Sequence, residues 1–141
     1  MRRRMLTSGL AMMALAGALG LSACATFGTD EAQALLDRPQ VDGDVPDSDI
    51  LDVENTADLG TFRFVGEDAE TNLRFYLARS LSDSYCVFAY ALDDSGAAGG
   101  CGPTGATVTG QLPEFRLIAG GPTPPAPEGF RAVGGGVFVR E

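Results

Sequence analysis

The sequence contains no histidine, no lysine and no tryptophan among its 141 residues. Without histidine, the chain cannot assemble the Ser-His or Cys-His pair that activates a nucleophile. Without lysine, it cannot form the glycine-rich loop with a lysine that holds nucleotide phosphates. These absences exclude the commonest hydrolase and nucleotide-binding sites. We therefore expect a protein that is not an enzyme and that carries no cofactor.

Paired carboxylates are the remaining candidates for catalysis. They are Glu67 with Glu70 and Asp93 with Asp94. A glycosidase needs two carboxyl groups that flank a cleft, and aromatic side chains usually face the sugar. Because these acids fall in expected turns and tryptophan is absent, we interpret them as exposed turn residues. The alternative is a small hydrolase that uses them.

Positive charge is also scarce, since 10 arginines face 19 acidic residues and the net charge is −9. A chain this acidic repels the phosphates of nucleic acid, which excludes nucleic acid as a partner. The length allows one small domain.

The first residues have the pattern of an export signal. Arg2, Arg3 and Arg4 form a basic segment, and the stretch from Met5 to Ala23 is uncharged and apolar. One alternative is that this stretch stays as an uncleaved membrane helix, because about 20 residues span a bilayer. Another is a plain secretory signal that is cut elsewhere. All three place the rest of the chain outside the cytoplasm.

Leu21-Ser22-Ala23-Cys24 resembles the lipobox of bacterial lipoproteins. The resemblance implies that residues 1–23 are a signal peptide and that the Cys24 thiol receives a diacylglyceryl group with acyl chains such as palmitate. It implies a protein anchored by lipid to the extracytoplasmic face of the cell membrane, and two acyl chains suffice for that. Cleavage removes three arginines and no acid, so seven arginines then face 19 acids and the net charge becomes −12.

Cys86 and Cys101 are the two cysteines that remain if Cys24 is acylated. An even number of cysteines in an oxidising compartment indicates a disulfide. A metal site is one alternative, although only two thiols and no histidine are present. A redox-active pair is another, although such pairs are usually spaced Cys-x-x-Cys.

Residues 24–58 are expected to form a flexible acidic tether. Residues 30–58 hold 10 of the 19 acids and a single arginine, Arg38, which is too much charge for a packed segment. Within it, residues 30–37 could form a short helix with Thr29 as cap, which Pro39 would end. A calcium loop over residues 42–54 is the alternative, but the ligand order of an EF-hand is not met.

Residues 59–141 alternate between apolar and polar positions, as β-strands do. The expected strands cover residues 61–65, 73–79, 85–92, 106–109, 112–118, 130–133 and 137–140. Ala97 to Gly102 is expected to be a loop that carries Cys101. Six or seven short strands separated by turns predict an all-β ectodomain, a small antiparallel sandwich or rolled sheet with one disulfide.

Short motifs across the same region resemble small actinobacterial envelope proteins of uncharacterised function. They are Arg38-Pro39-Gln40, Asp44-Val45-Pro46, Leu59 to Gly66, Tyr76-Leu77-Ala78-Arg79, Cys86-Val87, Gly100-Cys101-Gly102 and Val137-Phe138-Val139-Arg140. The resemblance supports the disulfide and implies no chemistry.

Four arginines alternate with apolar residues in the expected strands: Arg63, Arg74, Arg116 and Arg131. Since their apolar neighbours face the core, these arginines should face outward. They are either surface charges that protect exposed strands, or a row that binds an anionic wall polymer or an acidic envelope protein. We expect a non-catalytic interaction module; the alternatives are the hydrolase above and an accessory subunit of a transporter.

Overall fold

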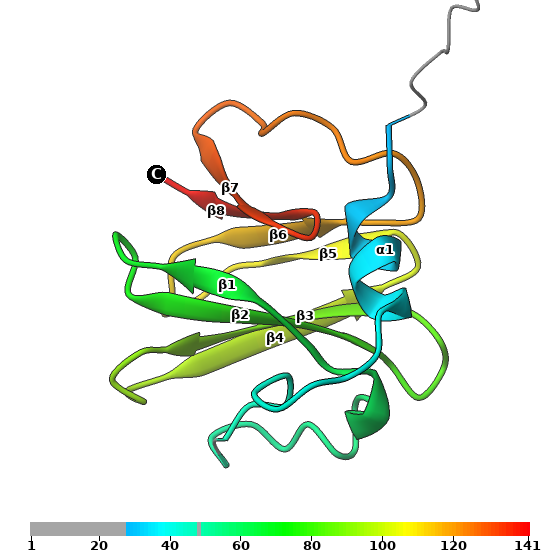
Figure 1. Cartoon of the computed structure of the whole chain (residues 1–141). Coiled ribbons are helices and arrows are strands. Elements are labelled where there is room, and N and C mark those ends of the chain that lie inside the picture. The colour runs from blue at the N-terminus through cyan, green and yellow to red at the C-terminus, as the bar shows by residue number, and fades with distance from the viewer. Residues whose placement is uncertain (1–27, 48) are drawn as a thin grey trace, which may run out of the picture.

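The computed structural model describes residues 28–47 and 49–141 (Figure 1). Within them the chain forms helix α1 (Glu31–Asp37), the 3-10 helix η1 (Leu59–Thr61) and eight strands. The strands are β1 (Arg63–Asp68), β2 (Leu73–Arg79), β3 (Tyr85–Ala91), β4 (Ala97–Gly102), β5 (Gly105–Val108), β6 (Phe115–Ile118), β7 (Phe130–Gly134) and β8 (Val137–Arg140). The signal peptide and the lipobox expected at residues 1–24 lie outside the described residues.

The strands form two antiparallel sheets of four, in the orders β1-β2-β3-β4 and β5-β6-β8-β7. Figure 1 shows the first sheet lying against the second, with α1 beside them. Because side chains alternate along a strand, each sheet turns one set of residues inward. The shared core includes Phe75, Leu77, Val87, Phe115, Leu117, Val137 and Val139, all buried. The predicted all-β sandwich is confirmed.

The Cys86–Cys101 disulfide is also confirmed. The two cysteines lie opposite each other in the β3–β4 pair, which stays in one register from Tyr85 and Gly102 to Tyr90 and Ala97. The expectation that Ala97 to Gly102 forms a loop is wrong. The disulfide and the regular ladder to β3 hold this small-residue segment as a strand, although glycine and alanine have low strand propensity.

We expect reduction of this disulfide to lower the free energy of unfolding by about 3 kcal/mol, because the loop that it closes has about 15 residues. Urea unfolding with and without reductant measures the loss. Intact-mass analysis should show a gain of two hydrogens on reduction. Alkylation of both Cys86 and Cys101 in the unreduced native protein would contradict the pairing.

The expected tether does not behave as a free segment from residue 28 onward. Helix α1 is capped by Asp30, whose carboxylate accepts the Gln33 N–H, and not by Thr29. Ala32 of this helix is fully buried, and Leu35 and Leu36 pack against the core between the sheets. The boundary expected at residue 59 is therefore too late, because α1 is part of the folded domain.

The next segment, residues 39–47 and 49–58, lies along the outer face of the first sheet, and we call it the acidic strap. Val53 and Ala57 are buried there, and Leu51 packs beside them against side chains such as Tyr76 and Phe88. The strap orders because these few apolar side chains point inward while most of its acids stay exposed. The acidic average composition of this segment did not reveal the spacing of its apolar side chains.

Candidate functional site

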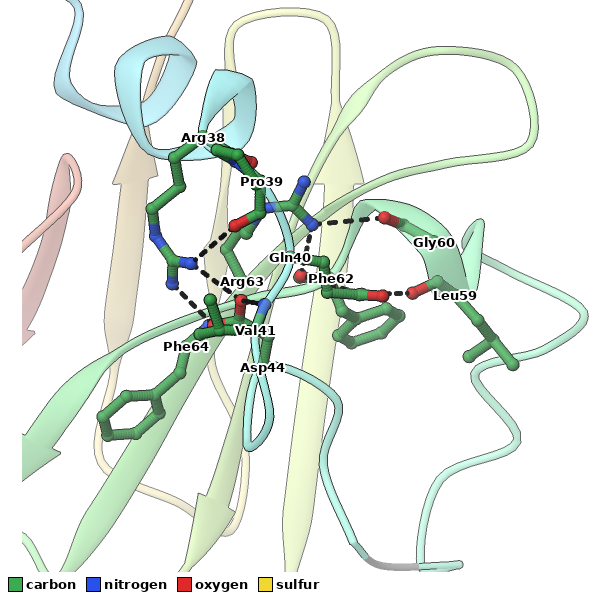
Figure 2. A network of polar contacts seen from close by, with 10 residues as sticks. All are labelled: Arg38, Pro39, Gln40, Val41, Asp44, Leu59, Gly60, Phe62, Arg63 and Phe64. Carbon is green, nitrogen blue, oxygen red and sulfur yellow. Dashed lines mark hydrogen bonds and ion pairs between the residues drawn. The ribbon is translucent and has the colours of Figure 1, made fainter.

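An ion pair fixes the start of the acidic strap. The Arg38 guanidinium donates to both carboxylate oxygens of Asp44, at 2.8 and 2.5 Å. The same carboxylate accepts the backbone N–H of Val41 at 2.8 Å and that of Phe64 in β1 at 2.9 Å. Figure 2 shows the two side chains facing each other above β1. Asp44 is 1% exposed, so this contact joins the strap to the sheet through a buried charge.

The environment of Asp44 determines its titration. Burial alone would raise the pKa of its carboxyl group, but the hydrogen bonds from Arg38 and from the Val41 and Phe64 N–H groups favour the charged form more strongly. The net effect lowers the pKa of Asp44 to about 2. Asp44 is therefore a structural anion and is not free to bind calcium. Among the residues that the structure describes, no group of three or more His, Cys, Asp or Glu side chains is placed to hold a metal ion.

Arg63 makes a second contact at the start of the acidic strap, where it binds the Arg38 carbonyl oxygen. It is 7% exposed, and its guanidinium donates to the carbonyl oxygens of Arg38, Gly60 and Phe62 at 2.8, 3.1 and 2.7 Å (Figure 2). The prediction that Arg63 faces outward is wrong. Arg38, η1 and Phe62 offer carbonyl groups at the edge of β1, and burial of these carbonyls requires a donor.

A shallow hollow of about 410 Å³ lies where the strap crosses β1 and β2. Its lining includes Asp42, Asp47, Glu67, Arg74 and Tyr76. Glu67 and Arg74 are opposite each other in the β1–β2 pair. The Nε of Arg74 is buried without a hydrogen-bond partner among the described residues, while its Nη2 lies 3.4 Å from the Leu92 carbonyl oxygen. The hollow thus mixes two arginines, Arg38 and Arg74, with several carboxylates and presents no surface of a single charge.

The other two predicted arginines are neutralised by acids. Arg116 and Arg140 both bind Glu114, each at 2.8 Å, and both guanidinium groups stack on the Phe130 ring. Arg131 binds Asp68 at 2.9 Å and Glu70 at 2.7 Å. The Arg131 contacts hold β7 to the end of β1 and to the turn that follows it.

The predicted arginine row is not formed. Arg74 lies opposite Tyr90, on the outer face of the first sheet, whereas Arg116 lies opposite Phe138, on the outer face of the second. Arg63 binds backbone carbonyl groups at β1, an edge strand of the first sheet. Arg131 binds Asp68 from β7, an edge strand of the second sheet. The alternation rule correctly turned Arg74 and Arg116 away from the core, but it could not show that they belong to different sheets.

Three of the four carboxylates of the hydrolase alternative have separate contacts of their own. Glu70 is bound to Arg131, while Glu67 lines the hollow beside Arg74. The Asp93 carboxylate accepts the Ser95 N–H in the turn between β3 and β4. The hollow lined by Glu67 does not include Glu70, Asp93 or Asp94 among its described lining residues.

A second hollow, of about 280 Å³, lies between the acidic strap and β4. Its lining residues are Leu51, Asp52, Val53, Thr56, Phe88, Gly99, Gly100 and Cys101. Sequence reasoning missed this feature because it treated both of its walls as irregular. The signal that was available is the disulfide itself, since a register centred between Asp93 and Asp94 carries β4 through to Cys101.

Comparisons with protein-family models, with curated proteins and with solved structures find no match to this chain. Within residues 28–47 and 49–141, no helix is both long and apolar enough to cross a membrane.

Proposed function

We propose that this protein is a lipid-anchored, non-catalytic interaction module on the extracytoplasmic face of the cell membrane. The observation that carries the proposal is the Cys86–Cys101 disulfide, in a chain whose residues 2–24 resemble an export signal with a lipobox. Stable disulfides belong to oxidising compartments, so the folded domain and the sequence signal favour the same location.

The proposed partner is another envelope protein. An anionic wall polymer needs unpaired cationic side chains, but Arg38, Arg116, Arg131 and Arg140 are each bound to a carboxylate. What the domain offers instead is the hollow between the acidic strap and β4, where apolar side chains lie beside an acid. Surfaces of this composition suit recognition of polypeptide.

The anchor is tested by replacing Cys24 with alanine in bacteria that process lipoproteins. We expect labelled fatty acid to enter the wild-type protein and not the Cys24→Ala variant, which should be released or persist as the uncleaved precursor. The Ser22→Ala variant is the matched control, because it keeps a small residue before the cysteine and should be acylated. Label in Cys24→Ala with an unchanged mature mass would contradict the proposal.

A further inference from the structure

Strand β4 is the least protected edge of the two sheets. Exposed edges pair readily with other strands unless charges, bulges or shortness prevent it. β1 has a bulge between Phe64 and Gly66, and β7 has one between Ala132 and Gly134. β5 has only four residues. β4 has six residues, a continuous register with β3, and neither a charged residue nor a proline.

The backbone groups of β4 that point away from β3 can be identified. The Ala91 N–H donates to the Gly96 carbonyl, and hydrogen-bonded pairs alternate with non-bonded pairs along an antiparallel ladder. The Cα atoms of Cys86 and Cys101 are 4.1 Å apart, as expected for a non-bonded pair. Ala97, Gly99 and Cys101 therefore direct their N–H and C=O groups outward. In the described part of the chain, no hydrogen bond to another segment occupies these groups.

The second hollow, which is lined by Leu51, Val53 and Phe88, lies directly beside this edge. Gly99 keeps the hollow open and the strand close to Phe88, because a Cβ at Gly99 would lie 2.3 Å from the Phe88 ring. Gly99 and Cys101 are exposed. An added strand would thus find open backbone groups and an apolar recess for one of its side chains.

The acidic strap supplies the charge at this place. Asp52 lines the hollow and is exposed, and the next hollow along the strap includes Asp49 and Glu54. Among the residues that the structure describes, no basic residue lines either hollow. An approaching segment with positive charge is favoured here, whereas a second copy of this chain would bring the same acids against each other.

We propose that β4 receives an extended, basic segment of a partner protein as an added strand, with one apolar side chain in the hollow beside Gly99. The backbone groups of Ala97, Gly99 and Cys101 provide the hydrogen bonds, and Asp52 selects for positive charge. This inference rests on the proposed interaction function and names the kind of partner that it would take.

The test uses the full chain in detergent micelles and a synthetic probe. The probe is the capped heptapeptide Arg-Val-Thr-Leu-Thr-Val-Arg, in which the valines and the central leucine lie on one face of the extended chain. In NMR titrations we expect it to shift the amide signals of Ala97, Gly99 and Cys101. The same peptide with an N-methyl group on every internal backbone nitrogen keeps its side chains but offers no internal backbone N–H on either edge, and it should bind at least tenfold more weakly. Equal binding of the two peptides would overturn the proposal.

Two variants locate the site. Ala97→Pro removes one outward N–H without removing a bond to β3 and should weaken binding about tenfold, with circular dichroism verifying that the variant is folded. Asp52→Asn should weaken binding two- to threefold at low salt, whereas the control Glu128→Gln, an exposed acid far along the chain, should have no effect. Should Ala97→Pro unfold, the N-methylated peptide still decides the question.

Sedimentation of the chain without peptide tests whether a second copy of the chain occupies the β4 edge. A dimer whose contacts involve β4 would show that a second copy fills this edge and would overturn the proposal. The unacylated Cys24→Ala chain should bind the probe as the wild type does. Failure of the anchor and failure of the edge are therefore observed in different experiments.

Discussion

Replacing Phe75 with alanine should lower the free energy of unfolding by about 3–5 kcal/mol, the loss typical of a large-to-small change in a packed core. Phe75 lies in β2 with no exposed surface. Its ring packs edge-to-face with that of Phe115 from the opposite sheet, and the two ring centroids are 5.5 Å apart. The substitution leaves a cavity at the contact that joins the two sheets. Urea unfolding, followed by circular dichroism, measures the loss.

Leu81→Ala is the control for this experiment, because Leu81 is 68% exposed and its replacement should change stability by less than about 0.5 kcal/mol. If Phe75→Ala does not fold, Phe75→Leu keeps most of the volume and should cost less than alanine. Similar stabilities for Phe75→Ala and Leu81→Ala would mean that the sheets are not packed as described.

Replacing Asp44 with asparagine should remove about 2–3 kcal/mol of stability at neutral pH and much of the sensitivity to acid. The pKa of Asp44 is about 2 in the folded protein and 3.8 when unperturbed, and each unit of difference corresponds to about 1.4 kcal/mol. Because the folded value is the lower one, this stability is present above about pH 4 and is lost as the pH falls toward 2. Wild type and Asp44→Asn should therefore converge in stability near pH 2.

Other carboxylates contribute in the same direction, so the comparison between the two proteins is what isolates Asp44. At Asp68, burial raises the pKa of the carboxyl group, but hydrogen bonds from Thr71 and Arg131 lower it by more. The net effect is a lowered pKa. Asp42→Asn is the matched control, since Asp42 is exposed two residues away and its replacement should have little effect on stability. A constant difference between wild type and Asp44→Asn from pH 7 to pH 2 would contradict the assigned role.

The sequence was informative where a local pattern and the core agree. Alternation along residues 73–79 and the uninterrupted apolar run from Tyr85 predicted two central strands, and the even cysteine count predicted the disulfide that joins β3 to β4. These features follow from side-chain geometry within one hairpin, which needs no knowledge of the rest of the fold.

The sequence failed where a distant segment decides the environment. Arg63 looks like a surface residue until the carbonyl groups of Arg38 and Gly60 are placed beside it. Asp44 looks like one more tether acid until Arg38 and the Phe64 N–H converge on it. Composition alone could not show the open β4 edge either, because glycine and alanine are typical of loops and the strand is held by its partner β3.

If Cys24 carries a lipid, the packing of α1 and the acidic strap also sets how far the domain can stand from the membrane. A free tether from Cys24 to Asp58 would reach about 120 Å when fully extended. Since Asp30, whose carboxylate accepts the Gly120 N–H, already belongs to the folded domain, at most six peptide steps from Cys24 remain, which reach about 20 Å. If Cys24 carries the lipid, the protein is confined to a thin layer at the bilayer surface. Partners would then have to lie in that layer.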